Sequence, residues 1–475
     1  MSPEVQVGGE GVARVARIVG IVNVTPDSFS DGGLCLDPPA AVAHGLSLLA
    51  DGADELDVGG QATSPGAPRI APASELARVV PVIKGLREAG VSAPISIDTY
   101  EPAVARAAIA AGADGINDIT GFRSPEMRAL VAETGVRCVV MAGAPEGRPD
   151  PGARQALAET WGFLEAQAAA LAPAPCALDP GFGFSGTRDD DIKLYGELLT
   201  TGLAQVGGEG VARVREWDHG ACPPGSATHF LTSRLHPLYI GLSRKRFLRT
   251  LFGDVDLDQA SSELSCALAA AGARYLRVHE VALARAELER FVTGPSQLAY
   301  VALGSNIGPC EEHLRAALRF LDALPATTLD AIARTYVSEP AADHDQPPFL
   351  NTVARLRTRL GPRALFAALQ ACERLMGRVK TRVNGPRSID LDLLSAGEVT
   401  ISTPALQIPH PRAAERAFVV EPLRDLDPDY RFPTGQRSRC EGRLDGAIME
   451  VRPALKLELE PEPEPETADQ RSPHV

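Results

Sequence analysis

Polar residues that can bind a ligand follow short apolar runs along roughly the first 280 residues of the chain. Asp98 follows residues 95–97, and Asp179 follows residues 177–178. The other residues placed in this way are Asn23, Asn117, Ser243, Lys245 and His279, while Arg277 lies inside the last run, residues 275–278. A carboxylate accepts two hydrogen bonds at once, so it suits a flat heterocycle that has an amino group beside a ring N–H. The cationic side chains suit a phosphorylated group.

Helix-length, alanine-rich stretches separate the apolar runs, as at residues 39–51, 74–89 and 101–111. Strands that alternate with helices predict parallel βα units. Eight such strands over roughly 280 residues predict a (β/α)8 TIM barrel, whose active site lies at the carboxyl ends of the strands. One carboxylate at a strand end would be interpreted as a helix cap or turn former. A whole set at strand ends predicts instead a single site at the barrel mouth.

A second group of chemically capable residues lies in residues 385–394, GPRSIDLDLL. Residues two apart on a strand face the same side, so Asp390 and Asp392 would present paired carboxylates. Such a pair repels unless a cation or proton lies between, and hard oxygen ligands beside phosphates favour Mg²⁺. The nearby basic residues are Arg378, Lys380, Arg382, Arg387, Arg412 and Arg416. Their charge matches a nucleoside triphosphate better than it matches an edge strand with solvated acids.

The composition bounds the classes of protein that the chain can belong to. Its 475 residues can bury at least two sizeable cores. A net charge of −14 argues against nucleic acid or an anionic membrane as a principal partner. The eight cysteines are spread singly, which predicts reduced thiols and a cytoplasmic location. No apolar run approaches the ~20 residues that span a bilayer, so we expect no membrane partner.

Three units are expected along the chain. A linker at residues 293–296 divides a barrel (residues 1–294) from an α/β unit (residues 297–440). Residues 441–475 are expected to form a disordered tail, because the acidic, proline-interleaved run within them cannot bury enough apolar area. The decapeptide QVGGEGVARV occurs at residues 6–15 and again at 205–214. The spacing is not that of a solenoid, and we have no physical explanation for the duplication.

The first unit resembles dihydropteroate synthase, most specifically at residues 21–33 (IVNVTPDSFSDGG) and 178–184 (LDPGFGF). The similarity also covers DVGG, SIDT, NDITG, GLSRK and RVHE and spans nearly all of residues 17–293. It implies a (β/α)8 barrel that joins 6-hydroxymethyl-7,8-dihydropterin diphosphate to p-aminobenzoate. By resemblance, the pterin ring is held by Asp98, Asn117, Asp179 and Lys245. The diphosphate and its Mg²⁺ are held by Asn23, Arg277 and His279, with Thr63 nearby and Ser243 beside p-aminobenzoate. The resemblance also raises a homodimer through the barrel.

This chain departs from the synthase pattern at three places, one of which is Ser185-Gly186 in place of the lysine that often follows LDPGFGF. Ser64 stands where the family has an arginine that reaches the diphosphate, and Met141-Ala142 replaces the usual His-Met. Two alternatives follow: the barrel is a catalytically impaired pterin-binding scaffold, or it is a pterin-dependent methyltransferase of the same superfamily. The NVTPDSFSDGG loop argues against the methyltransferase.

The second unit resembles 6-hydroxymethyl-7,8-dihydropterin pyrophosphokinase at residues 303–308, 345–351, 377–394 and 409–418. The family has a ferredoxin-like α+β fold and transfers diphosphate from ATP to the pterin hydroxymethyl group. By resemblance, Asp390 and Asp392 bind Mg²⁺. The ATP phosphates meet Arg378, Arg387, His410 and Arg416, with Gln370 and Glu373 on the nucleotide side. Asn351 reads the pterin edge, and Phe349 and Phe418 stack on its ring.

The two resemblances support each other, because the product of the pyrophosphokinase is the substrate of the synthase. The sequence therefore predicts a bifunctional enzyme of folate biosynthesis, with the synthase first in the chain. Its expected partners are small molecules: ATP, hydroxymethyl-dihydropterin, the diphosphate of that pterin and p-aminobenzoate. Mg²⁺ is the expected cofactor in both domains.

Overall fold

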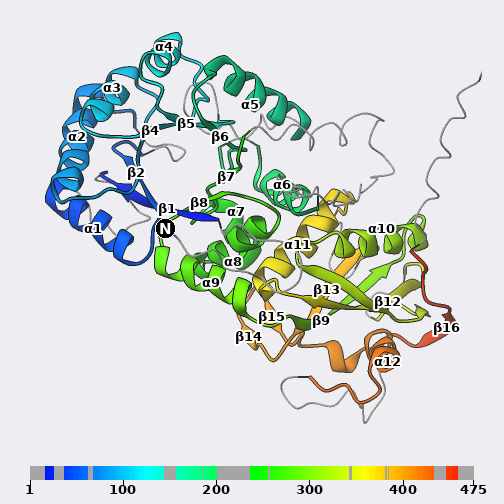
Figure 1. The fold of residues 1–475 in the computed structure, drawn as a ribbon. Helices are drawn as coiled ribbons and strands as arrows, with labels where there is room; N and C mark the ends of the chain where they lie inside the picture. Colours follow the sequence, from blue (N-terminus) through cyan, green and yellow to red (C-terminus); the bar gives the residue numbers. More distant parts are fainter. Residues whose placement is uncertain are drawn as a thin grey trace, which may run out of the picture.

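The computed structural model of the chain describes residues 16–25, 37–62, 68–143, 157–184, 186–200, 236–254, 257–341, 345–379, 382, 385–432 and 445–457. In these residues a barrel of parallel strands, ringed by helices, is followed by an antiparallel sheet that carries helices (Figure 1). Both copies of the repeated decapeptide lie outside the described residues.

The first eight strands form a closed parallel barrel. They are β1 (Arg17–Asn23), β2 (Glu55–Gly59), β3 (Ile95–Asp98), β4 (Gly115–Asp118), β5 (Arg137–Met141), β6 (Cys176–Asp179), β7 (Tyr239–Ile240) and β8 (Tyr275–Val278). Their order is β6-β5-β4-β3-β2-β1-β8-β7. A parallel bridge between Leu178 and Leu238 joins β6 to β7 and closes the ring. The predicted TIM barrel is confirmed.

Helices follow the barrel strands along the chain. They are α1 (Pro38–Ala50), α2 (Pro72–Glu88), α3 (Pro102–Ala110), α4 (Pro125–Thr134), α5 (Leu157–Leu171), α6 (Arg188–Thr200), α7 (Arg246–Phe252), α8 (Leu257–Ala270) and α9 (Val281–Thr293). Each of the first four begins with proline, whose fixed φ and missing N–H suit the first helical position. Helix α4 is also capped by Ser124, which accepts from the Met127 N–H, and it ends at Gly135 with φ +66°.

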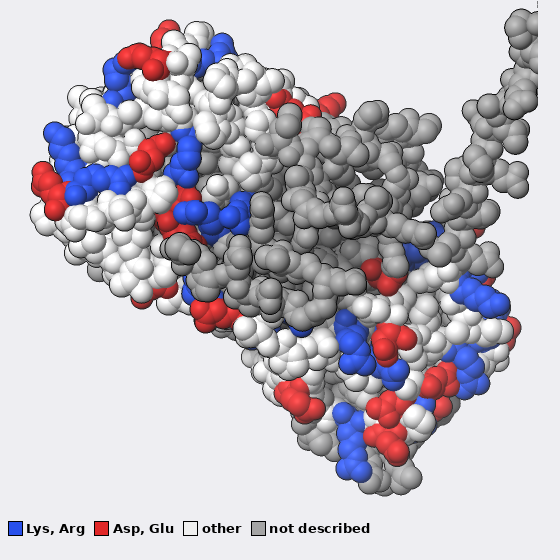
Figure 2. Space-filling view, in the orientation of Figure 1, with Lys and Arg blue, Asp and Glu red and all other residues white. Residues whose placement is uncertain are grey.

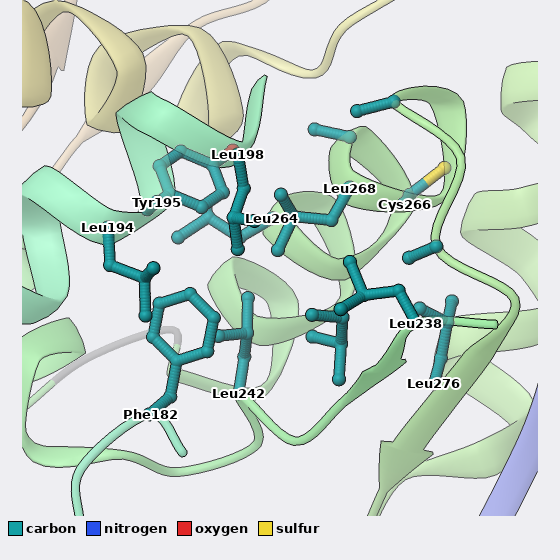
Figure 3. Packing of buried hydrophobic residues seen from close by; sticks show 14 of the residues in the cluster. Phe182, Leu194, Tyr195, Leu198, Leu238, Leu242, Leu264, Cys266, Leu268 and Leu276 are labelled. Carbon is teal, nitrogen blue, oxygen red and sulfur yellow. The ribbon is translucent and has the colours of Figure 1, made fainter. Parts of the chain in front are cut away.

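Apolar side chains fill the layer between the strands and their helices. Figure 3 shows Leu194, Tyr195 and Leu198 of α6 converging with Leu264 and Leu268 of α8. These side chains are almost completely buried. Burial of an aliphatic or aromatic side chain stabilises by about 1.5–3 kcal/mol. This layer therefore fixes the helices against the strands whose ends carry the polar residues.

The second domain is an antiparallel sheet with helices. Its elements are β9 (Gln297–Ser305), α10 (Cys310–Asp322), β10 (Thr327–Ile332), β11 (Thr335–Ser338), β12 (Phe349–Thr358), α11 (Pro362–Leu375), β13 (Asp390–Ala396), β14 (Ile401–Ser402), β15 (Gln407–Ile408), a 3₁₀ turn (Ala413–Glu415), α12 (Ala417–Leu426) and β16 (Ile448–Arg452). The main sheet has the order β13-β9-β12-β11-β16, and β10 also pairs with β12. This is the α+β domain that the sequence predicts.

The expected disordered tail from residue 441 needs correction at residues 445–457. Strand β16 pairs antiparallel with β11, with Thr335 opposite Arg452, and Leu455 is buried. Most side chains of β16 are exposed, so it is an edge strand held by backbone pairing rather than by an apolar face. Residues 458–475 lie outside the described residues.

Helix α11 joins the two domains. It packs against α6 and α8 of the barrel as well as against β13. Leu264 of α8 and Leu365 of α11 belong to the same continuous cluster of buried apolar residues, and the rings of Phe252 and Phe366 lie 5.8 Å apart. The apolar core is thus continuous from one domain to the other.

Charge is mixed on the surface. On the face drawn in Figure 2, acidic and basic side chains are interspersed over both domains. Within the described residues, no helix combines the length and the apolar character needed to cross a membrane.

Candidate active sites

Polar side chains meet at the carboxyl ends of β2, β3, β4 and β8. Arg277 donates from Nε to Asp57 Oδ2 at 2.6 Å and from Nη2 to Asp98 Oδ2 at 2.8 Å. Asn117 donates from Nδ2 to the same oxygen of Asp57 at 3.0 Å. Register explains the meeting, because Asp98 lies opposite Gly59 on one neighbouring strand and opposite Asn117 on the other. We call Asp57, Asp98, Asn117 and Arg277 the ring network.

Asp57 is the centre of the ring network, and the sequence reasoning gave it no role. It is fully buried and accepts hydrogen bonds from Ser96, Asn117 and Arg277. A carboxylate between the apolar residues Leu56 and Val58 of the strand ELDVG was the available signal. A buried carboxylate needs paired donors, and three strands supply them here.

Asn117 also offers an unused acceptor. Its Oδ1 atom is buried and has no hydrogen-bond partner among the described residues. An unsatisfied buried acceptor costs about 1–3 kcal/mol. A ligand that donates a hydrogen bond at this point would remove that cost.

Asp179 and Lys245 lie on the other side of the same mouth. A Cβ atom built on Gly241 would lie 3.9 Å from Asp179 Oδ2 and 4.0 Å from Arg277 Cδ, so both side chains lie beside Gly241. The Lys245 Nζ atom lies 4.0 Å from the centre of the Phe184 ring, and the Gly181 N–H donates to Asp179 Oδ1 at 2.8 Å. The four residues predicted to hold a pterin ring therefore lie at the same end of the barrel, where Asp179 and Asp98 both act on the charge of Lys245.

Burial brings the ionisation of these groups close to neutral pH. It raises the pKa of Asp98 to about 7, although Arg277 lowers it and Asp57 raises it further. Burial also raises the pKa of Asp179 to about 6 and lowers the pKa of Lys245 to about 8. Groups that change charge near pH 7 are typical of sites that bind or transfer protons.

Three further predicted residues lie nearby, and one cannot be placed. Ser243 Oγ and His279 Nδ1 are 2.8 Å apart, and burial together with Arg244 and Arg277 lowers the pKa of His279 well below its usual value. A Cβ on Gly59 would lie 3.7 Å from Asn23 Oδ1 and 3.5 Å from Asp98 Cβ, which puts Asn23 beside the ring network. Thr63 and Ser64 lie outside the described residues. So the structure places together all the predicted barrel residues that it describes.

A cavity of about 780 Å³ lies at the opposite, amino end of the barrel. Glu55, Arg137 and Tyr275 line it, and no member of the ring network does. Its position at the strand starts separates it from the chemistry at the mouth.

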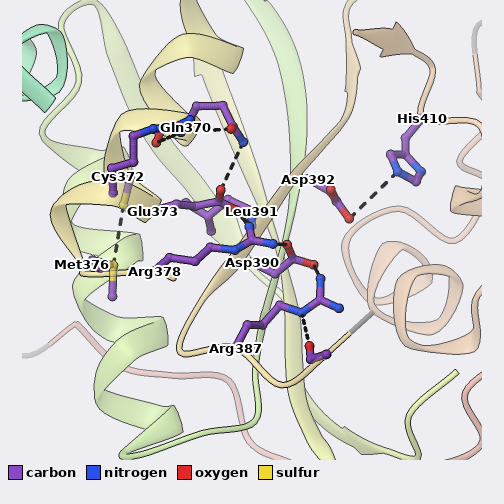
Figure 4. A network of polar contacts seen from close by, with 12 residues as sticks. Gln370, Cys372, Glu373, Met376, Arg378, Arg387, Asp390, Leu391, Asp392 and His410 are labelled. Carbon is purple, nitrogen blue, oxygen red and sulfur yellow. Dashed lines mark hydrogen bonds and ion pairs between the residues drawn. The ribbon is translucent and has the colours of Figure 1, made fainter. Parts of the chain in front are cut away.

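The second site surrounds β13. Asp390 pairs with Arg378 Nη2 at 2.7 Å and with Arg387 Nη1 at 2.8 Å. Asp392 lies 3.4 Å from Arg416 Nη1. Its carboxylate also lies 4.0 Å from His410 Nε2 (Figure 4). The burial pattern of β13 confirms the predicted alternation, since both aspartates are partly exposed while the residues between and after them are buried.

Two buried residues hold the arginines of this site. Glu373 of α11 pairs with Arg378 and accepts from the Leu391 N–H at 2.8 Å. Asn306, which the sequence reasoning did not single out, accepts from the Arg387 N–H at 2.8 Å. Gln370 donates to Glu373 at 3.1 Å, so Gln370 and Glu373 form the support of the basic cluster (Figure 4).

A cavity of about 190 Å³ adjoins the two aspartates. Phe349, Asn351 and Phe418 line it together with Asp390, Asp392, Arg387, His410, Arg412 and Arg416. Asn351 is fixed by a hydrogen bond to Ser338 Oγ at 3.0 Å. An aromatic and amide end beside a charged end suits a flat ring that carries a group reacting with phosphate.

The charges of this second site are also perturbed. Burial raises the pKa of Asp392 to about 6, and the negative charge of Asp390 raises it as well. Burial raises the pKa of Glu373 to about 7 and, aided by Arg416, lowers the pKa of His410 to about 4. His410 is therefore neutral at pH 7.

The donor set of Asp390 and Asp392 fits a magnesium ion. The two carboxylates stand on one face of β13, and burial of Asp392 beside Asp390 disfavours two negative charges. The described residues contain no group of three or more His, Cys, Asp or Glu that could hold a metal by themselves. Mg²⁺ often takes one or two carboxylates and completes its shell with phosphate and water oxygens. At the barrel mouth, Asn23 would supply one amide oxygen to such an ion.

Known proteins resemble the two halves separately. Residues 19–279 match the model of a family described as pterin binding enzyme, and residues 300–428 match that of 7,8-dihydro-6-hydroxymethylpterin-pyrophosphokinase. The dihydropteroate synthase of Mycobacterium leprae is 37% identical over 56% of this chain and 88% of its own length. The 2-amino-4-hydroxy-6-hydroxymethyldihydropteridine pyrophosphokinase of Pseudomonas aeruginosa is 47% identical over 30% of this chain and 86% of its own length.

A solved structure is also similar. It is the dihydropteroate synthase of Xanthomonas albilineans with 4-aminobenzoic acid. The two chains are 37% identical, and the match covers 58% of this chain and 92% of the other with a TM-score of 0.46.

Proposed function

The chain belongs to the pterin binding enzyme family and continues into a domain of the pyrophosphokinase family. We propose which of its residues carry out each of two successive reactions. It is a bifunctional transferase of folate biosynthesis. The second domain transfers diphosphate from ATP to 6-hydroxymethyl-7,8-dihydropterin, and the barrel condenses the product with p-aminobenzoate to give 7,8-dihydropteroate. The observation that carries this assignment is that one chain contains two polar sites. The ring network lies at the mouth of the barrel, and the paired aspartates Asp390 and Asp392 lie in the second domain.

In the pyrophosphokinase site, the pterin hydroxymethyl oxygen attacks the β-phosphorus of ATP, and the bond to the α-phosphate oxygen breaks to release AMP. Phe349 and Phe418 would hold the ring, with Asn351 at its edge. Arg387 and Arg416 face the same cavity and would neutralise charge on the phosphates as it develops. Mg²⁺ held by Asp390 and Asp392 would supply further neutralisation of the phosphate oxygens.

In the synthase site, the bond between the pterin methylene and the diphosphate breaks, and the amine of p-aminobenzoate attacks that carbon and loses a proton. Asp98, Asp179 and the free Oδ1 of Asn117 would accept hydrogen bonds from the pterin ring, and Lys245 would donate to it. The buried Oδ1 of Asn117, which has no hydrogen-bond partner among the described residues, supports this assignment. Arg277, His279 and Asn23 would meet the departing diphosphate and its Mg²⁺, and Ser243 would lie beside p-aminobenzoate.

The ring network gives no support to a catalytically impaired barrel. Arg277 is held by two carboxylates at the barrel mouth and is thus preorganised beside the opening. A homodimer through the barrel and a cytoplasmic location stay predictions. The faces of α6 and α8 that contact α11 are covered within the chain, so a dimer would use other faces.

A coupled assay tests the assignment. The full chain is supplied with ATP, Mg²⁺, 6-hydroxymethyl-7,8-dihydropterin and p-aminobenzoate, and AMP and dihydropteroate are measured separately. We expect both products in equal amounts when synthase turnover keeps pace. AMP without dihydropteroate, even when the pterin diphosphate is added directly, would overturn the synthase assignment and leave the scaffold alternative.

A further inference from the structure

Helix α11 contacts the barrel through a close approach of two small residues. A Cβ atom built on Gly196 of α6 would lie 2.6 Å from Ala371 Cβ and 3.1 Å from Leu375 Cδ1. Carbon atoms in contact are normally about 3.5–4.0 Å apart. Any side chain at position 196 would therefore push α11 away from α6.

Two charged contacts fix the ends of the same helix to the barrel. At its start, Arg363 donates from its backbone N–H and from Nη1 to Glu263 of α8, both at 2.8 Å. Glu263 and Arg363 are mostly buried, with side chains 3% and 14% exposed. Near its end, Arg374 Nε lies 2.8 Å from Asp189 of α6. The barrel therefore sets both the distance and the direction of α11.

The opposite face of α11 supports the pyrophosphokinase site. Glu373, two residues after Ala371, pairs with Arg378 and accepts from the Leu391 N–H. Leu391 lies between Asp390 and Asp392, and Arg378 pairs with Asp390. The buried carboxylate of Glu373 thus connects α11 both to β13 and to Arg378, which would contact MgATP.

We propose that the barrel positions the pyrophosphokinase site through α11, so that Gly196 of the synthase domain is a positioning residue for diphosphate transfer. The path runs from Gly196 to Ala371, then through Glu373 to Arg378 and β13. The proposal rests on the function assigned above. It implies that the second domain needs the barrel for full activity. The two reactions are then linked by the packing of α6 against α11 as well as by their shared intermediate.

The test replaces Gly196→Ala in the full chain and measures both activities. Displacing reacting groups by about 1 Å can reduce a rate on the order of 100-fold, so we expect kcat/KM for MgATP to fall at least tenfold. The KM for hydroxymethyl-dihydropterin should change little, because Phe349 and Asn351 lie on β12 rather than on β13. The synthase activity, assayed with the pterin diphosphate supplied, should be unchanged and reports that the barrel is folded.

Two variants control for nonspecific effects of the substitution. Gly162→Ala makes the same change in helix α5, where an added Cβ would meet nothing within 4 Å, and it should leave both activities unchanged. The double variant Gly196→Ala/Ala371→Gly removes the opposing methyl group and should restore MgATP kinetics at least partly.

The outcomes separate this proposal from the assigned function. No AMP from the unaltered chain would refute the pyrophosphokinase assignment itself. An active unaltered chain whose Gly196→Ala variant has normal MgATP kinetics would overturn the positioning role. Loss of both activities in that variant, without rescue by Ala371→Gly, would overturn it as well, because the effect would then be general unfolding.

Discussion

The substitution Asp57→Asn tests the ring network at its centre. It keeps the shape of the side chain and removes the charge that faces Arg277 Nε at 2.6 Å. The new amide would also present either an N–H₂ group or a neutral oxygen to donors from Ser96, Asn117 and Arg277. The fully buried position leaves no water to replace the lost acceptor.

The expected magnitude follows from the lost contact. A hydrogen bond to a charged group contributes about 1.5–3 kcal/mol, which corresponds to roughly 10- to 150-fold in rate. We expect kcat/KM of the synthase reaction to fall within that range, because Arg277 would then be held by Asp98 alone among the carboxylates of the ring network.

The pH dependence gives a second, independent signature. Burial raises the pKa of Asp98 to about 7, and the charge of Asp57 contributes to raising it. In the proposed site, ionised Asp98 would accept hydrogen bonds from the pterin through both oxygens, and protonation would turn one of these oxygens into a donor. Synthase activity should therefore fall as the pH drops through about 7. Neutralising Asp57 removes a cause that raises this pKa, so the acid limb should move to lower pH.

The assay follows dihydropteroate formation from added pterin diphosphate across pH, with AMP formation in the same chain as the internal control. Asp254→Asn, at an aspartate whose side chain is 79% exposed, is the matched control and should change neither activity. An Asp57→Asn variant with an unchanged kcat/KM and an unmoved acid limb would refute the role of the ring network.

Three further predictions concern the metal, the pH response and the core. Chelation of divalent cations should stop AMP formation and added Mg²⁺ should restore it; AMP release that persists in a chelator would exclude the metal role of the two aspartates. Burial raises the pKa of Asp392 to about 6, so the affinity for Mg²⁺ should fall as the pH drops through about 6. His410→Gln should leave this fall in affinity unchanged, because burial lowers the pKa of His410 to about 4. If the fall disappears in His410→Gln, it belongs to His410 and not to Asp392. Tyr195→Phe should raise the free energy of unfolding by about 1–3 kcal/mol, because the Tyr195 hydroxyl is buried without a hydrogen-bond partner among the described residues; a lower unfolding temperature would contradict this.

Much of the barrel could be predicted because its physics is local. Apolar runs of strand length place Asp98, Asn117 and Asp179 at the strand ends, and parallel register brings Asp98 beside Asn117. Asp57 lies inside β2, as Arg277 lies inside β8. The resemblance assigned a role to Arg277 and none to Asp57, so Asp57 was missed. A carboxylate in that setting is itself a signal, since burial demands donors from other strands.

Features that depend on distant parts of the chain were not predicted. Strand β16 pairs with β11 more than 100 residues earlier, and its exposed side chains carry no alternation that would predict a strand. The contact between domains was also missed. Helix α11 is apolar on more than one face, with Ala364, Leu365, Ala367, Ala368, Leu369, Ala371 and Cys372 buried. A helix that is apolar on several faces must be covered on several sides.

The most direct test of two separate sites in one chain uses Asp392→Asn with two sets of substrates. Given ATP, Mg²⁺, hydroxymethyl-dihydropterin and p-aminobenzoate, this variant should form neither AMP nor dihydropteroate. Given the pterin diphosphate and p-aminobenzoate, it should form dihydropteroate at the rate of the unaltered chain. AMP formation by the variant, or no dihydropteroate from the added diphosphate, would contradict the division of the two reactions between the barrel and the second domain.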